Sequence, residues 1–144
     1  MQQSYRRTVP VIAHSPADRN ANPSIVVVDD QPDLLAVMVD VLESEGYHAL
    51  GVESPAALEE TLRATRPDLI LLDVVLPGTS GIDLATHLRA NGYRDTPIIA
   101  MSASLPMARS ADDSHLFQET LVKPFAVSTL LARIERYCSP GADE

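Results

Sequence analysis

The chain has 144 residues, a formal net charge of −9 and a single cysteine, Cys138. This length favours one domain that can bury its own core, and the lone cysteine excludes an intramolecular disulfide. No apolar run approaches the ~20 residues that a helix needs to cross a bilayer, so membrane insertion is not expected. Before residue 24, three arginines oppose one aspartate, which leaves −11 on the rest of the chain. A globule that acidic repels phosphate backbones, so direct binding to nucleic acid is not expected.

Residues 1–23 are expected to form a disordered tail, because Pro10, Pro16 and scattered charges accompany only short apolar runs. These runs are too short for a secretory signal, and with the free cysteine this favours a cytoplasmic location. The folded unit is expected over residues 24–139. Residues 140–144 are expected to be a short polar tail, which leaves no room for an output domain.

Five short apolar runs predict strands of the buried type. They span residues 25–28, 47–52, 69–72, 97–101 and 120–122. The run at 47–52 is the weakest of the five. A strand as short and apolar as 69–72 is typical of the centre of a parallel sheet.

Apolar residues at helical spacing follow four of these strands, bounded by capping and turn residues. The expected helices run from Pro32 to Gly46, from the N-cap Ser54 to Pro67, from Ser80 or Gly81 to Asn91, and from Val127 to Cys138. Residues 103–118 are poorly patterned, so only a short or mobile helix is expected there.

Five strand–helix pairs, (βα)5, predict an α/β fold with a doubly wound, five-stranded parallel sheet and right-handed crossovers. In such a sheet the carboxyl ends of the strands share one edge, where open α/β sheets place their sites. The central strand ends at Asp73, and the turn residues Pro77, Gly78 and Gly81 follow it.

Polar side chains end four of the five strands. They are Asp29 with Asp30, then Asp73, Ser102 and Lys123. If these strands are neighbours, three carboxylates meet in one cleft and need a cation, for which the hard, oxygen-seeking Mg²⁺ is suited. A carboxylate beside a divalent ion, an ammonium and a hydroxyl is a nucleophile prepared for phosphoryl transfer.

Lys123 is the only lysine in the chain, and every other fixed cation is an arginine. A compact ammonium on a flexible stem can enter a pocket that a planar guanidinium cannot. The single lysine is explained equally well by a functional need for a compact ammonium and by chance in a composition that favours arginine.

Four motifs lie on these strand ends. They are Val-Val-Val-Asp29-Asp30, Leu-Leu-Asp73-Val-Val-Leu-Pro77-Gly-Thr-Ser-Gly81, Ile-Ile-Ala-Met-Ser102-Ala and Val-Lys123-Pro124-Phe. Each alone is a weak signal, but in this order and at these separations they are specific. Over residues 24–139 the chain resembles the receiver domain of response regulators in two-component signalling. The resemblance implies a flavodoxin-like sheet with strand order 2-1-3-4-5.

The resemblance also implies a role for each site residue. Asp73 accepts a phosphoryl group from the phosphohistidine of a histidine kinase. The implied ligands of Mg²⁺ are Asp29, Asp30, Asp73 and the backbone carbonyl of Val75. Ser102 hydrogen-bonds the phosphoryl group, and Lys123 pairs with Asp73 before phosphorylation and with the phosphoryl group after it. The Lys123–Pro124 bond is expected to be cis.

By this resemblance the protein is a single-domain response regulator that catalyses its own phosphorylation and dephosphorylation and turns over no external substrate. Its partners are a histidine kinase or a histidine phosphotransfer protein, and a downstream protein target. The phosphorylated form alters docking to that target or relays the phosphate. The chain is expected to be a monomer or a phosphorylation-dependent dimer.

The chain departs from the family pattern at two places. Thr120 stands where the family usually has an aromatic residue whose rotation reports phosphorylation. The poorly patterned residues 103–118 fall where a signal-carrying helix is expected. Gln31, next to the acid pair, leaves the charge of the site unaltered and is a candidate for tuning the phosphoryl lifetime.

Two other readings remain open. A pseudo-receiver, a binding module of the same fold that has abandoned phosphorylation, is opposed by the complete set of site residues and favoured by Thr120 and by the poorly patterned residues 103–118. A phosphatase with an aspartyl nucleophile ranks last. Such enzymes have an Asp-x-Asp motif whose second aspartate is the general acid, and two residues after Asp73 this chain has Val75. A P-loop NTPase is excluded because the chain contains no G-x-x-x-x-G-K-[ST] motif.

Overall fold

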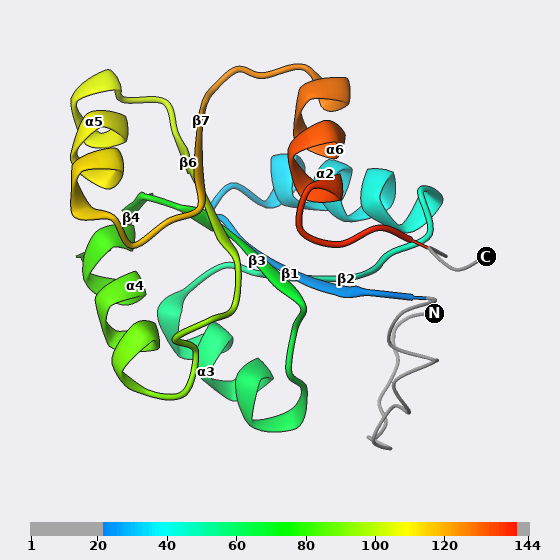
Figure 1. Cartoon of the computed structure of the whole chain (residues 1–144), viewed down its shortest axis with the longest axis horizontal. Coiled ribbons are helices and arrows are strands. Elements are labelled where there is room, and N and C mark those ends of the chain that lie inside the picture. The colour runs from blue at the N-terminus through cyan, green and yellow to red at the C-terminus, as the bar shows by residue number, and fades with distance from the viewer. Residues whose placement is uncertain (1–21, 141–144) are drawn as a thin grey trace.

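A computed structural model describes residues 22–140 of the chain. Its main sheet has five parallel strands, in the spatial order β2-β1-β3-β6-β7 (Figure 1). Their bounds are β1 Ser24–Val28, β2 His48–Val52, β3 Leu69–Asp73, β6 Ile98–Ser102 and β7 Glu119–Val122. Counted within this sheet alone, the order is 2-1-3-4-5, so the predicted (βα)5 fold and its strand order are confirmed.

Five helices cover the two faces of the sheet (Figure 1). They are α2 Pro32–Ser44, α3 Pro55–Ala64, α4 Gly81–Ala90, α5 Leu105–Ser114 and α6 Val127–Glu135. Helices α2 and α6 pack on one face, and α3, α4 and α5 pack on the other. Both faces of the central strands are therefore removed from water.

The alternation of side chains along each strand builds the two halves of the core. In β1 and β3, Val27 and Leu71 face α2 and α6, while Val26 and Ile70 face α3 and α4. All four side chains are fully buried, and burial of this kind stabilises a fold by about 1.5–3 kcal/mol per large aliphatic side chain. The core leaves β1 and β3 in parallel register, so their carboxyl ends lie side by side.

Helix α5 is longer and better defined than its sequence pattern indicated. The Ser104 hydroxyl caps it by accepting a hydrogen bond from the Met107 amide. Its buried face consists of Ala108 and Ala111, which are small and give a weak periodic signal. The small residues let the helix lie close to the sheet at Ala100.

The last helix is shorter than predicted, since α6 ends at Glu135. Tyr137 and Cys138, which extend its apolar pattern, lie beyond the helix but still pack against the core. A second difference is a two-stranded antiparallel ribbon after β3, formed by β4 Val75–Leu76 and β5 Thr79–Ser80. Strands of two residues carry no periodic signal by which the sequence could reveal them.

Within residues 22–140, no helix is long and apolar enough to cross a membrane. The expected disorder of the first 23 residues and the expected tail at 140–144 fall almost wholly outside the described residues.

Candidate functional site

Three carboxylates gather at the carboxyl edge of the sheet. Val28 pairs with Leu72 in the register of β1 and β3, so the next residues, Asp29 and Asp73, emerge side by side. One oxygen from each of Asp29, Asp30 and Asp73 lies within 4.8 Å of the others. Asp29 has no exposed surface and Asp73 is 5% exposed, so the repulsion between these groups is weakly screened.

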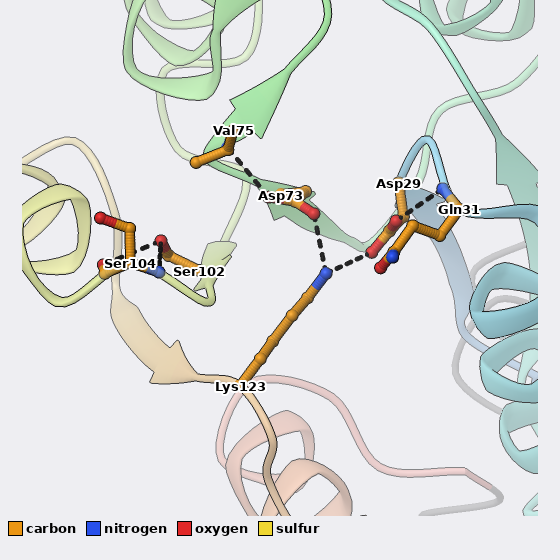
Figure 2. A network of polar contacts seen from close by, with 7 residues as sticks. All are labelled: Asp29, Gln31, Asp73, Val75, Ser102, Ser104 and Lys123. Atoms are coloured by element: carbon orange, nitrogen blue, oxygen red, sulfur yellow. Dashed lines mark hydrogen bonds and ion pairs between the residues drawn. The ribbon is translucent and has the colours of Figure 1, made fainter.

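Lys123 supplies the counter-charge. Its Nζ atom lies 2.8 Å from Asp29 Oδ2 and 2.8 Å from Asp73 Oδ2, and Figure 2 shows the ammonium between the two carboxylates. The other oxygens are held by backbone amides: Asp29 Oδ1 accepts from Gln31 and Asp73 Oδ1 from Val75, each at 2.9 Å. The pairing with Asp73 agrees with expectation, whereas the equal contact with Asp29 was missed by sequence reasoning.

One ammonium shared by two buried carboxylates leaves an excess of negative charge. Burial raises the pKa of Asp73, and the hydrogen bonds from Lys123 and Val75 lower it without cancelling that effect. The Asp29 charge raises the Asp73 pKa further. For Lys123, burial lowers the pKa, but the bonds to Asp29 and Asp73 outweigh it, so its pKa is raised and the ammonium stays charged.

Ser102 ends β6 at the same edge but turns toward another partner. Its hydroxyl donates to the Ser104 carbonyl and accepts from the Ser104 amide, both at 3.0 Å (Figure 2). The backbone links it to the lysine, because the Lys123 amide donates to the Ser102 carbonyl at 2.8 Å. The Lys123–Pro124 peptide bond is cis, as expected. Ser104 is thus a second serine at this edge, and its place as the cap of α5 gave no separate functional signal in the sequence.

The structure brings four of the predicted site residues into direct proximity: Asp29, Asp30, Asp73 and Lys123. Ser102 ends β6 at the same edge of the sheet, with its hydroxyl bonded to Ser104. The Val75 amide is at the site through its bond to Asp73. A metal-binding role for the Val75 carbonyl stays a prediction.

The donor set fits a magnesium ion. Three carboxylates offer hard oxygen ligands, and a single lysine does not neutralise them. Mg²⁺ binds through a few carboxylates and retains several waters, which suits a site open on one side at the partly exposed Asp30.

Thr120 occupies β7 opposite Ala100, on the side of the sheet that α5 covers. Its Oγ1 atom is buried and has no hydrogen-bond partner among the described residues. A threonine here neither fills the volume of an aromatic ring nor anchors itself to a neighbour. The structure therefore gives no support to an aromatic-type rotation at this position.

Replacing Thr120 with valine is expected to leave the free energy of unfolding unchanged or to raise it by up to about 1 kcal/mol. The reason is that a buried hydroxyl without a partner costs free energy, and valine has nearly the same shape. Urea unfolding of both proteins measures the difference. A loss above about 1 kcal/mol would show that the hydroxyl has a partner in solution.

A five-stranded parallel sheet with three aspartates and a lysine at the carboxyl edge defines a receiver-type α/β protein. In agreement, the family model of the response regulator receiver domain matches residues 25–135. That match covers more than half of the chain. The chain therefore belongs to the response regulator receiver domain family, whose place in two-component signalling implies phosphoryl acceptance.

Curated relatives are full-length regulators. The chain is 34% identical over 127 residues to the DNA-binding response regulator MtrA of Mycolicibacterium smegmatis, covering 83% of this chain and 52% of that protein. It is 33% identical over 131 residues to the phosphate regulon transcriptional regulatory protein PhoB of Pseudomonas aeruginosa, covering 84% and 55%. The chain thus spans about half the length of these relatives.

Solved receiver structures share the fold. The response regulator TrrA of Thermotoga maritima, in complex with Mg²⁺–BeF, has a TM-score of 0.71 and 30% identity, over 80% of this chain and 98% of that one. The chemotaxis response regulator CheY4 of Vibrio cholerae has a TM-score of 0.73 at 23% identity, over 81% and 98%, and this likeness concerns the fold alone.

Proposed function

We propose that this protein is a phosphorylatable receiver in which Asp73 accepts a phosphoryl group from the phosphohistidine of a histidine kinase or a phosphotransfer protein. The observation that carries the proposal is the position of Asp73: its carboxylate contacts the Lys123 ammonium and lies close to two further aspartates. An aspartate so placed has a cation at hand for the charge of the transferring group.

In the proposed reaction, a carboxylate oxygen of Asp73 attacks phosphorus. The P–N bond to the donor imidazole breaks, its electron pair returns to the ring nitrogen, and a P–O bond forms. The residues that would hold Mg²⁺ are Asp29, Asp30, Asp73 and Val75 through its carbonyl, and the ion would supply positive charge for the phosphoryl oxygens. The Lys123 ammonium moves from the carboxylate to a phosphoryl oxygen. The Ser102 hydroxyl gives up its hydrogen bond to Ser104 and donates to a second phosphoryl oxygen.

Apolar residues around the site support a role for protein partners. Each of them follows or ends a strand at the carboxyl edge and is 41–57% exposed: Val75, Leu105, Val122 and Val127. Solvent-exposed aliphatic side chains around a polar site favour docking of another protein surface. We infer that the kinase or phosphotransfer partner contacts this rim, and that phosphorylation changes the affinity for a downstream protein or passes the phosphate on.

The direct test is the mass of the intact protein after incubation with a small phosphodonor such as acetyl phosphate, with and without Mg²⁺. A Mg²⁺-dependent phosphoryl adduct in the natural chain, absent from Asp73→Asn, is expected. Asp68→Asn, at the other end of the same strand, is the matched control and should still form the adduct. An adduct that persists in Asp73→Asn would remove Asp73 as the acceptor.

Magnesium is expected to raise the unfolding temperature in the absence of any phosphodonor, because the ion relieves the repulsion of the three carboxylates and binds only the folded site well. At an ion concentration of one hundred times Kd, the free energy of unfolding rises by about 2.7 kcal/mol. Asp30→Asn should lose most of this shift. Asp33→Asn, in the first turn of α2, should keep it. Equal shifts in the two variants would refute the proposed metal ligands.

A pseudo-receiver that binds partners without phosphorylation is the second candidate, favoured by Thr120 at the usual aromatic position, whose hydroxyl has no partner within residues 22–140. The mass measurement separates the two functions. No adduct, under conditions that label a control receiver, would favour the pseudo-receiver.

A further inference from the structure

An open groove of about 340 Å³ lies between α2 and the edge strand β2 and extends to Pro32, two residues after Asp30. Leu35, Ala36 and Val39 form its apolar part, and Asp40 and Glu53 carry its charge. The groove exists because Gly51 has no side chain: a Cβ atom there would lie 2.7 Å from Leu35 Cγ. Figure 1 shows β2 at the border of the sheet with α2 beside it.

The segment that contributes α2 and β2 to the groove contains no lysine or arginine. Between Arg19 and Arg63 the sequence contains nine aspartates and glutamates but neither lysine nor arginine. Among the described residues, the ion pairs found do not involve Asp40 or Glu53. An occupant of the groove must therefore bring its own positive charge together with apolar side chains.

The backbone of β2 adds a second kind of binding site. Among residues 22–140, strand β2 has one neighbour in the sheet, β1. The His48 amide and the Val52 carbonyl both point to that neighbour, since they bond to Pro23 and to Asp29. The intervening groups of a strand alternate, so the amides and carbonyls of Ala49 and Gly51 point outward. Such an edge accepts an extended peptide as an additional strand.

We propose that residues 6–12 of the same chain, Arg-Arg-Thr-Val-Pro-Val-Ile, bind this groove as an extended segment. The arginines supply positive charge that can pair with Asp40 and Glu53. The valines and the isoleucine cover the apolar part of the groove. Proline is compatible with an added edge strand, whose outer side needs no hydrogen bonds. This proposal is independent of phosphorylation.

The chain enters the fold at the start of β2, and the groove lies near the other end of this strand. The Pro23 carbonyl accepts from the amide of His48, the first residue of β2. The ten residues 13–22 span up to ~33 Å when extended, whereas the five residues of β2 cover only ~17 Å. Reach is therefore sufficient, and tethering gives an effective concentration in the millimolar range, at which a weak contact is occupied.

The test places a nitroxide on the full chain at Thr8→Cys, with Cys138→Ser so that a single thiol is labelled, and records amide signals by NMR. The signals of Asp40, Gly51 and Glu53 are expected to lose intensity. The intensities of these signals should recover in the double variant Arg6→Glu/Arg7→Glu. Arg19→Glu, a charge reversal outside the proposed segment, is the matched control and should leave the loss unchanged.

Full intensity at the groove amides would overturn the proposal and leave the groove to a basic peptide from another protein. A second sample mixes nitroxide-labelled chains without isotope and isotope-labelled chains without nitroxide. Intensity loss at the same amides in this mixture would also overturn it, in favour of a second copy of the chain. Intensity loss only in the first sample, in which each chain carries both the isotope and the nitroxide, supports binding within one chain.

Discussion

Replacing Lys123 with methionine is expected to lower the free energy of unfolding by about 3 kcal/mol when no divalent ion is present. Methionine keeps most of the aliphatic stem but removes the one cation that pairs with the buried carboxylates of Asp29 and Asp73 in the described part of the chain. Removing one partner of a buried ion pair costs about 3–5 kcal/mol. The lower end applies because the pKa of Asp73 is already raised by burial, so that carboxyl can take up a proton.

Urea unfolding in the presence of a chelator and of Mg²⁺ measures this effect. Mg²⁺ should restore most of the loss, since the ion supplies the missing positive charge at the same carboxylates. Arg136→Met is the matched control: Arg136 is 59% exposed in its ion pair with Glu119, and exposed pairs contribute at most about 1 kcal/mol. A loss of equal size with and without Mg²⁺ would show that Lys123 acts through packing rather than through charge.

The sequence predicted the sheet well because its strands are buried on both faces. Continuous runs such as residues 69–72 have few alternatives in a chain of this length. Once the strands are placed, topology brings their carboxyl ends to one edge. Asp29, Asp73 and Lys123 could thus be grouped before any contact was known, and the structure places them within hydrogen-bond distance.

What the sequence did not reveal depends on packing and on choices between partners. Helix α5 presents alanines to the sheet, so its buried face has almost no hydrophobic period. The Ser102 hydroxyl can bond a phosphoryl group or its own loop, and in this structure it bonds Ser104. The lysine could have served one carboxylate and serves two. Such outcomes are set by distances of a few ångströms between residues far apart in the chain.

Replacing Gly81 with alanine is expected to lower the free energy of unfolding by about 2 kcal/mol, in the range for an overpacked site. A Cβ atom at this position would lie 2.6 Å from the Asp73 carbonyl oxygen and 2.6 Å from Val74 Cα. Both contacts are with backbone, which cannot rotate away as a side chain can. The Gly81 amide also donates to the Val74 carbonyl, so the start of α4 is held against the segment that carries the acceptor.

The strain should reach the site, because relief of the clash moves the Asp73 backbone. A displacement near 1 Å costs roughly a hundredfold in rate when it misaligns a reacting group, so phosphorylation by a small donor should slow by about that factor. Gly78→Ala is the matched control. Gly78 has a φ of 79° and open space around its Cβ position, so alanine there strains the turn by about 1–2 kcal/mol without touching Asp73. Two variants of similar stability would then differ strongly in phosphorylation rate. Similar rates in both would mean that the Asp73 segment yields to the added methyl group without losing its alignment.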